Sequence, residues 1–429
     1  MKTIHIGLIG YGTVGQGVAK ILHRCAPLYK KQYNADFSLR KVFDRSLAKK
    51  DTRYVPAPAL AKSIEEVVKD PAVDVVIELI GGTGPAKKLI VEALKGGKHV
   101  ITANKELIAN CGAELFALAR KNGRCLYYES AVMAGIPVIK TISEGLAGNR
   151  FDSLYGIING TCNFILTEMF EKHLSFGEAL KLAQQNGYAE SNPTLDINGM
   201  DTAHKLAILI FLAMGKHVPV KDIYTEGITQ IDHADIEHAE SLGLRIKLLA
   251  IAKREEDEIE ARVHPTLISG SHPLASINGV LNAAYMEGNH VGKILLSGKG
   301  AGQMTAASGV ISDLISLATR GADGHLPSNN IISTGKLKLC KIDDIDTKFY
   351  LRFTAPDKPG TLSKITGVLG KHGIGINSVT QKPHIKKATV PVIMLTDFTT
   401  ERALRKALNE IHTRKMVSAR PVAIRMEKL

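Results

Sequence analysis

The chain has 429 residues, enough for two or three domains, and its 45% hydrophobic and 23% charged residues are typical of a soluble globular protein. The net charge of +13 comes almost entirely from residues 345–429, which hold 16 lysines and arginines against 6 acids; because no aromatic side chains are interleaved with them, we expect no nucleic-acid partner. No apolar run is long enough to cross a bilayer, and five scattered cysteines without CxxC spacing argue against a zinc site and favour a reducing cytoplasm.

The first expected element is a strand over residues 4–9 that turns sharply into a helix. Between them stands GYGTVG. Gly10 permits the tight turn, Gly12 permits close approach of a pyrophosphate, and Gly15 permits close packing of helix on strand. Thr13 and Val14 complete the turn, where the amide groups of a helix N-terminus attract an anion. This context predicts a Rossmann-type dinucleotide-binding domain.

The second expected strand, Phe37–Phe43, ends where such a fold contacts the adenosine ribose. Asp44 suits the 2′-hydroxyl of NAD, whereas Arg45, with Lys49 and Lys50 behind it, suits the 2′-phosphate of NADP. The choice between NAD and NADP therefore stays open. The long connection before this strand predicts a loop insertion over residues 27–36.

Strands and helices then continue to alternate as far as residue 105. Apolar strands between amphipathic helices predict a doubly wound parallel sheet, whose ligands bind at the carboxyl ends of the strands. Thr83 and Lys105 follow two of those ends, so topology places them near the cofactor. The alternative for Lys105 is a surface lysine at a helix start.

The densest chemistry lies in GYAESNPTLDINGMDTAHK, residues 187–205, directly before the apolar run LAILIFLAM. Asp201 and Lys205 are four residues apart, so a helix starting near Asp201 places both on one face. A lysine beside carboxylates against an apolar wall can protonate or polarise a carbonyl oxygen. The alternative is a solvated ion pair ahead of a core helix.

Residues 154–296 mix helical periods with strand-like runs. We expect helices over 175–186, 200–214 and 235–252, and strands such as IEARVHPTLIS. This mixture predicts an α+β domain inserted into the dinucleotide fold. A helix over 305–319 should then return to the first domain.

After a stretch rich in Gly, Asn and Pro at 321–330, the pattern restarts as βαββαβ. This order predicts an antiparallel sheet with both helices on one face. The segments DKPGTLSKI and GINS make the module resemble an ACT regulatory domain. That resemblance implies an amino-acid effector at the first strand–helix turn, with contacts from Asp357, Lys358, Gly360 and Asn377. The alternative is a ferredoxin-like dimerisation domain that binds no ligand.

Six segments, in order, resemble the homoserine dehydrogenases, which interconvert L-aspartate 4-semialdehyde and L-homoserine with NAD or NADP. They are GYGTVG, TANKELIA, ESAVMAGIP (129–137), GIINGTCNFIL (156–166), GYAESNPTLDINGMDTAHKLAIL (187–209) and GKGAGQMTAASGVISDLI (298–315). One departure is Gln303-Met304, where the family commonly has a proline. The resemblance implies a place in the pathway from aspartate to threonine, methionine and isoleucine, with L-threonine as the typical effector.

The resemblance implies roles that agree with the pattern at 187–205. Lys205 would be the acid/base group, Asp201 would orient the site, and Lys105 would lie between substrate and cofactor. As hydride reaches the aldehyde carbon, an ammonium group aimed at the oxygen stabilises the developing charge and supplies the proton.

Further contacts follow from the same resemblance. Glu190 would bind the substrate's amino group, and Asp196 and Thr161 would assist. Gly187 and Gly302 would lie near the nicotinamide half of the cofactor.

The segment 129–136 resembles the family's sodium loop, in which main-chain carbonyls hold a monovalent cation. The implied ligands are the carbonyls of Glu129, Val132, Ala134 and Ile136. Carbonyl ligands leave almost no side-chain signature, so a plain strand-to-helix turn ending at Pro137 stays open.

The expected boundaries divide the chain into four parts. They are a cofactor domain at 1–130, completed by 300–325, a catalytic and dimerisation domain at 131–299, a linker at 326–344, and the ACT domain at 345–429. The resemblance implies a homodimer or homotetramer.

Two other functions remain open. An acylating semialdehyde dehydrogenase needs an activated cysteine thiolate beside a histidine, and Cys162 in NGTCNF is the candidate. A non-catalytic module that senses nucleotides and amino acids would bind the cofactor without turnover.

Overall fold

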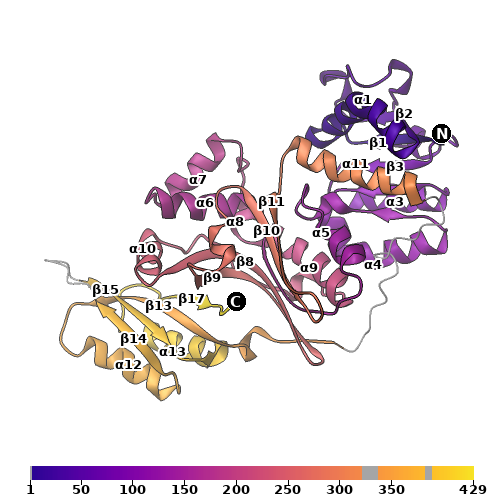
Figure 1. Ribbon diagram of the computed structural model, residues 1–429. Coiled ribbons are helices and arrows are strands. Elements are labelled where there is room, and N and C mark those ends of the chain that lie inside the picture. The colour runs from indigo at the N-terminus through magenta and orange to yellow at the C-terminus, as the bar shows by residue number, and fades with distance from the viewer. Residues whose placement is uncertain (1, 321–336, 382–388) are drawn as a thin grey trace. The chain divides into compact units, whose positions relative to one another are not determined.

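The computed structural model describes residues 2–320, 337–381 and 389–429 (Figure 1). Within them the chain forms two compact units, each assembled from separate stretches of the sequence. The first unit comprises residues 1–160, 201–223 and 280–337, and the second comprises 161–200, 224–279 and 338–429. Residues 321–325 of the expected cofactor domain and 326–336 of the expected linker lie outside the described residues.

Five parallel strands form one sheet of the first unit, in the order β2-β1-β3-β4-β5. They are β1 (Lys2–Ile9), β2 (Ala35–Phe43), β3 (Val75–Glu78), β4 (His99–Thr102) and β5 (Leu126–Tyr127). Their connecting helices are α1 (Thr13–Tyr33), α2 (Ile64–Val68), α3 (Gly84–Lys95) and α4 (Lys105–Lys121). Every residue of β3 and β4 is buried, as in a parallel sheet covered on both faces. The expected doubly wound fold is confirmed.

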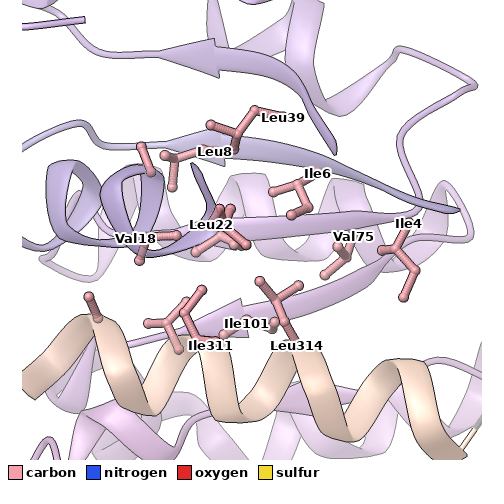
Figure 2. Close-up of a cluster of buried hydrophobic side chains, with 14 of the residues drawn as sticks. Ile4, Ile6, Leu8, Val18, Leu22, Leu39, Val75, Ile101, Ile311 and Leu314 are labelled. Atoms are coloured by element: carbon pink, nitrogen blue, oxygen red, sulfur yellow. The ribbon is translucent and has the colours of Figure 1, made fainter. Parts of the chain in front are cut away.

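The core of this sheet includes a helix from the far end of the unit. Helix α11 (Gln303–Arg320) packs beside α1, and Leu314 of α11 joins Leu22 of α1 and Leu8 of β1 in one apolar cluster (Figure 2). The expected return of a helix over 305–319 to the first domain is thereby confirmed.

The loop insertion expected before the second strand is wrong. Helix α1 continues through Pro27 and ends at Tyr33. Pro27 lacks the amide that would bond to the His23 carbonyl, but both residues are exposed to water. The buried Tyr29 packs against Phe37 with ring centroids 5.8 Å apart. This apolar contact holds the helix to the sheet beyond the proline.

Other elements of the first unit complete the surroundings of the site. They are β6 (Phe151–Ile157), β10 (Leu281–Gly288) and β11 (Gly292–Lys299), which form an antiparallel ribbon, with α5 (Val138–Lys140) and α9 (Met200–Met214). Helix α9 lies against α4, where the rings of Phe116 and Phe211 stack with centroids 5.8 Å apart. This contact holds together the two helices that carry Lys105 and Lys205.

The second unit contains helices and a long hairpin. They are α6 (Gly160–Glu171), α7 (Phe176–Gln185), α8 (Thr194–Ile197), α10 (His233–Ser241), β7 (Tyr224–Thr225), β8 (Leu244–Glu255) and β9 (Glu258–Ser269). The expected helix over 235–252 is wrong beyond residue 241. Gly243 (φ +70°) ends the helical stretch, and the following apolar run pairs with β9 as an antiparallel strand. A short apolar run is compatible with the period of a helix and with that of a strand. Here the pairing with β9 determines that it forms a strand.

The C-terminal part of the second unit has the expected βαββαβ order. Its elements are β13 (Asp346–Pro356), α12 (Thr361–Lys371), β14 (Ile376–Gln381), β15 (Thr389–Thr396), α13 (Glu401–Thr413) and β17 (Val422–Met426), with the short strands β12 (Lys338–Leu339) and β16 (Thr399–Thr400). The sheet is antiparallel, and α12 and α13 share one core on one of its faces (Figure 1). Unexpectedly, β17 also pairs in parallel with β9.

Among the residues that the structure describes, no helix combines the length and the apolar character that a membrane crossing requires.

Candidate active site

Two steric limits and one open space shape the glycine turn between β1 and α1. A methyl group on Gly10 (φ +97°) would lie 2.6 Å from the backbone of the loop after β3, and one on Gly15 would lie 2.2 Å from the Gly10 oxygen. Beside Gly12 nothing lies within 4 Å. Helix α1 begins with Thr13 and Val14, without a side-chain cap and without an acid in its first turn. The turn therefore fits a pyrophosphate on the helix amides.

Asp44, at the end of β2, is held by protein groups. Its Oδ2 accepts a hydrogen bond from the Tyr11 amide (2.8 Å) and pairs with the Lys50 ammonium (2.7 Å), while its Oδ1 accepts from the amide and hydroxyl of Ser46. Burial alone would raise the pKa of this carboxyl, but these hydrogen bonds lower it to about 2. Arg45 beside it is exposed. At the predicted ribose end of the cofactor site, the Asp44 carboxylate is thus paired with a lysine, and the Arg45 side chain beside it is exposed.

Thr83 and Lys105 lie at the strand ends that the topology predicts. Thr83 directly precedes α3, and Lys105 is the first residue of α4. Strands β3 and β4 are neighbours, with Glu78 opposite Thr102 at their carboxyl ends. The two predicted residues therefore follow adjacent strands on the edge of the sheet where ligands bind.

One buried carboxylate joins the two predicted lysines. Asp201, in the first turn of α9, accepts a hydrogen bond from Lys205 Nζ at its Oδ2 (2.7 Å), and Lys105 Nζ lies 2.8 Å from its Oδ1. The Asp201 side chain is only 7% exposed and that of Lys205 only 13%. The ion pair expected from the four-residue spacing is therefore present, and it is not a solvated surface pair.

This cluster carries an excess of one positive charge, because two ammonium groups share one carboxylate. Burial alone would raise the pKa of Asp201, but Lys205 and Lys105 outweigh burial and hold the pKa well below its usual range. Asp201 therefore stays ionised at neutral pH. An excess cation in a partly buried setting can stabilise an oxyanion.

Two groups that the sequence did not single out complete the cluster. Asn159 Nδ2 donates to Asp201 Oδ2 at 2.9 Å, and the Ile158 carbonyl accepts from Lys205 Nζ at 2.8 Å. Both lie in the turn between β6 and α6. Asn159 belongs to the GIINGT motif, so an amide ahead of a glycine at a strand–helix turn was the available signal. A main-chain carbonyl such as that of Ile158 leaves none.

The predicted substrate residues belong to the second unit. Thr161 Oγ1 donates to the Tyr188 carbonyl (2.6 Å) and so holds the loop that carries Gly187 (φ +72°) and the exposed Glu190. Asp196 lies half-buried in α8. Within this unit, the first turn of α6 and the loop ahead of α8 are linked, and Glu190 is accessible to a ligand.

Gly302 lies directly before α11 with φ +122°, a backbone region that favours glycine. Gln303 and Met304 form the first turn of that helix. A proline is tolerated in a first helical turn but is not needed there. The family's proline can therefore be replaced by these residues without loss of the helix.

Comparisons with known proteins agree with this geometry. The sequence pattern described as homoserine dehydrogenase matches residues 137–315, and that of the homoserine dehydrogenase NAD-binding domain matches residues 10–129. The homoserine dehydrogenase of Neisseria gonorrhoeae is 41% identical to this chain over an alignment that covers 100% of both. The chain belongs to the homoserine dehydrogenase family.

Solved structures of homoserine dehydrogenases resemble the fold. A crystal structure of a homoserine dehydrogenase from Thiobacillus denitrificans has a TM-score of 0.93 and 40% identity, covering 100% of this chain and 99% of that one. A hyperthermophilic archaeal homoserine dehydrogenase in complex with NADPH has a TM-score of 0.62 and 26% identity, covering 74% of this chain and 98% of that one. The protein is an NAD(P)-dependent oxidoreductase of this family, and the ACT pattern matches residues 349–414.

The homoserine dehydrogenase sodium loop would correspond to a buried turn between β5 and α5. Met133 (φ 56°) and Ala134 (φ 43°) both adopt left-handed backbone, which is uncommon for residues with a Cβ atom. Val132 is buried, and the Ile136 carbonyl already accepts a bond from the Val138 amide (2.7 Å). In the described ranges no cluster of His, Cys, Asp or Glu could hold a metal, so a cation here would depend on main-chain oxygens.

The Glu129 side chain accepts hydrogen bonds from backbone amides of α5. Its two oxygens accept the amides of Ile139 (2.9 Å) and Lys140 (3.0 Å), and its own amide donates to Asp313 of α11 (3.0 Å). Burial, followed by the charge of Asp313, raises the pKa of Glu129 to about 8. Only the carbonyl of Glu129 is then left to face a cation.

Three of the four predicted effector residues lie in the turn between β13 and α12. Asp357 and Lys358 are exposed, and Gly360 (φ +84°) precedes the helix. Asn377 is exposed on β14, where the pairing with β15 shifts register. All four positions are accessible to a small molecule.

Cys162 does not have the surroundings of a nucleophile. Its side chain is fully buried in α6, and Sγ donates to the Asp196 carbonyl at 3.2 Å. An enclosed thiol that donates a hydrogen bond is not an activated thiolate. This observation argues against the acylating dehydrogenase.

Proposed function

We propose that this protein catalyses the reversible NAD(P)-dependent reduction of L-aspartate 4-semialdehyde to L-homoserine. Family membership supports this reaction, and the observation that carries it is the buried Asp201 carboxylate with its two lysine ammonium groups. That cluster provides a proton donor and a positive charge at one point, as reduction of an aldehyde requires.

Lys205 serves as the acid/base group. When bound, the nicotinamide cofactor supplies or accepts the hydride at the carbon that carries the oxygen. As charge builds on the aldehyde oxygen, the Lys205 ammonium stabilises it and then donates a proton, and in the reverse direction the amine accepts the hydroxyl proton. Asp201 holds the ammonium in place, and the more exposed Lys105 (42%) contacts substrate and cofactor.

Glu190 binds the α-ammonium group of the substrate. Its exposed carboxylate supports this role, because a cation leaving water requires a countercharge. Asp196 shares this task, and Thr161 holds the loop that carries Glu190 through its hydrogen bond to the Tyr188 carbonyl.

Three further assignments belong to the same proposal. The carbonyls of Glu129, Val132, Ala134 and Ile136 hold a sodium ion, and the ACT domain binds L-threonine at Asp357, Lys358, Gly360 and Asn377. The chain works as a cytoplasmic homodimer or homotetramer. Its five free cysteines support a reducing compartment.

The test is oxidation of L-homoserine, followed by absorbance of the reduced nicotinamide, with NAD and NADP separately and with and without L-threonine. Turnover supports the reaction, and a lower rate with threonine supports the effector assignment. Cofactor binding without turnover would instead indicate a sensing module and overturn the proposal.

A further inference from the structure

A glutamate with no part in the proposed proton transfer lies on the central strand of the five-stranded parallel sheet. Glu78, the last residue of β3, is completely buried. Its Oε1 accepts the amides of Ile80 (2.8 Å) and Gly81 (3.1 Å), and its Oε2 accepts the hydroxyl of Thr102 (2.6 Å). These three partners lie at the carboxyl ends of β3 and β4, on the edge of the sheet where ligands bind.

The hydrogen bonds continue from Thr102 to the start of α4. Thr102 Oγ1 accepts the Asn104 amide (3.0 Å), and Asn104 Oδ1 caps α4 by accepting the Leu107 amide (3.1 Å). Asn104 Nδ2 also donates back to the Gly82 carbonyl (2.7 Å). Glu78 and Asn104 therefore close a ring between the loop after β3 and the loop after β4.

This ring determines where α4 begins. The first residue of α4 is Lys105, whose ammonium lies 2.8 Å from Asp201. Gly81 (φ +73°) and Gly82 (φ +71°) have conformational freedom, and the Glu78 carboxylate removes it by holding the loop amides. A lysine on an untethered helix start would sample other positions, because its side chain is 42% exposed.

We propose that Glu78 is the positioning residue for Lys105. Its carboxylate acts through Thr102 and Asn104 to hold the first turn of α4, and thus holds the Lys105 ammonium against Asp201. The inference rests on the proposed role of Lys105. It assigns to Glu78 no contact with substrate or cofactor.

A double-mutant cycle tests this coupling in the full-length protein. Glu78→Gln keeps the side-chain volume, but when its oxygen accepts the amides of the loop, the nitrogen that replaces Oε2 cannot accept the Thr102 hydroxyl. We therefore expect kcat to fall about tenfold. In a Lys105→Met background the same change should lower kcat less than about twofold, because the residue it positions is gone. A loss as large in the Lys105→Met background as in the wild type would overturn the proposal.

Two companion variants separate positioning from general stability. Thr102→Val removes the bond to Glu78 and also the bond from the Asn104 amide, so it should give at least the same coupling. Lys98→Met removes two bonds of a buried lysine, to the Asp70 and Val73 carbonyls, near the amino ends of the same strands. Its effect should be equal in both backgrounds.

A readout without turnover covers the case in which Lys105→Met is inactive. Acetylation of Lys105 by a water-soluble acetyl ester, followed by peptide mass spectrometry, should become several-fold faster in Glu78→Gln and stay unchanged in Lys98→Met. An unchanged labelling rate in Glu78→Gln would overturn the proposal. If Lys105→Met retained full activity while labelling still accelerated, the role of Lys105 would fail but its positioning by Glu78 would stand.

Discussion

At the scale of single residues, a carboxylate shared by two lysines gives each of its neighbours a different task. Asp201 Oδ2 receives Lys205 and Asn159, and Oδ1 receives Lys105. Lys205 is the more buried of the two lysines and is held by Oδ2. Lys105 is the more exposed and is held by Oδ1. Substitutions at this cluster should therefore separate proton transfer from binding.

Lys205→Ala should lower kcat by about three orders of magnitude, because general acid catalysis and charge stabilisation are lost together. Binding of NADPH, measured by its fluorescence, should remain near the wild-type value, since Lys205 takes no part in the glycine turn. Substantial turnover in this variant would remove Lys205 as the acid/base group.

Glu190→Ala should act mainly on substrate binding. Loss of the carboxylate leaves the α-ammonium without its countercharge, so KM for homoserine should rise by about tenfold or more while kcat changes less. Steady-state kinetics with homoserine as the varied substrate measures both, and an unchanged KM would exclude this contact.

We predict that the cofactor end of the site prefers NADP to NAD. The carboxylate of Asp44 is neutralised by Lys50, so it is poorly placed to select the 2′-hydroxyl of NAD, and Arg45 stands exposed beside it. We expect kcat/KM to be higher with NADP, and we expect Arg45→Ala to lower it with NADP by about tenfold but hardly with NAD. A preference for NAD in the wild type would contradict this prediction.

The sequence allowed prediction of the charged side chains that form the site. The pair Asp201 and Lys205 followed from helical spacing, and Lys105 followed from topology. Asn159, Glu78 and the Ile158 carbonyl did not, because their roles depend on which strand ends become neighbours in space.

At the scale of elements, β8 carries a lysine that the sequence gives no reason to bury. Lys247 is 4% exposed, and its ammonium donates to the Ile277 carbonyl (2.6 Å) and to the side-chain oxygens of Asn278 (3.0 Å) and Asn163 (3.3 Å). It thereby joins β8 to α6 and to the loop before β10. All three acceptors are uncharged.

This burial predicts a pH dependence of stability. Burial, and next the charge of Arg245, lowers the pKa of Lys247 to about 8 from 10.5. Between these values the unfolded chain binds a proton that the folded chain does not, so this group makes the free energy of unfolding rise with pH, by about 1 kcal/mol per pH unit. Denaturant unfolding of wild type and Lys247→Met from pH 7 to 10 should show this slope in their difference. A flat difference would contradict it.

The elements that the sequence predicted wrongly share one cause. Proline at 27 and the apolar run after residue 243 were interpreted by local preference. Tyr29 keeps α1 on the sheet, and pairing with β9 turns the apolar run into a strand. Tertiary contacts determine the structure in both cases. The periodic strands and helices of the cofactor domain and of the C-terminal module could be predicted from their hydrophobic period alone.

At the scale of the whole molecule, the C-terminal module is joined to the rest of its unit by buried ion pairs. Arg352 of β13 binds both oxygens of the fully buried Asp235 in α10, at 2.6 Å and 3.0 Å, and Tyr350 donates to the same carboxylate. Breaking a buried pair from one side leaves an uncompensated charge.

Arg352→Ala should therefore lower the free energy of unfolding by about 3 kcal/mol. If L-threonine lowers the rate of the wild type, this variant should lose most of that response, because the two-oxygen contact of Arg352 with Asp235 of α10 is gone. Thermal unfolding and homoserine oxidation with and without threonine measure the two effects. A destabilised variant with full threonine inhibition would show that the signal does not pass through Asp235.

The packing of α11 beside α1 in the first unit also bears on how the chain is made (Figure 2). The apolar face of α1, with Val18 and Leu22, leaves the ribosome early, but its cover of Ile311 and Leu314 is synthesised almost three hundred residues later. At roughly 5–20 residues per second that interval lasts roughly 15–60 s. During this interval the apolar face of α1 lacks its cover from α11. The nascent first domain is therefore a natural client for chaperones that shield unfinished chains.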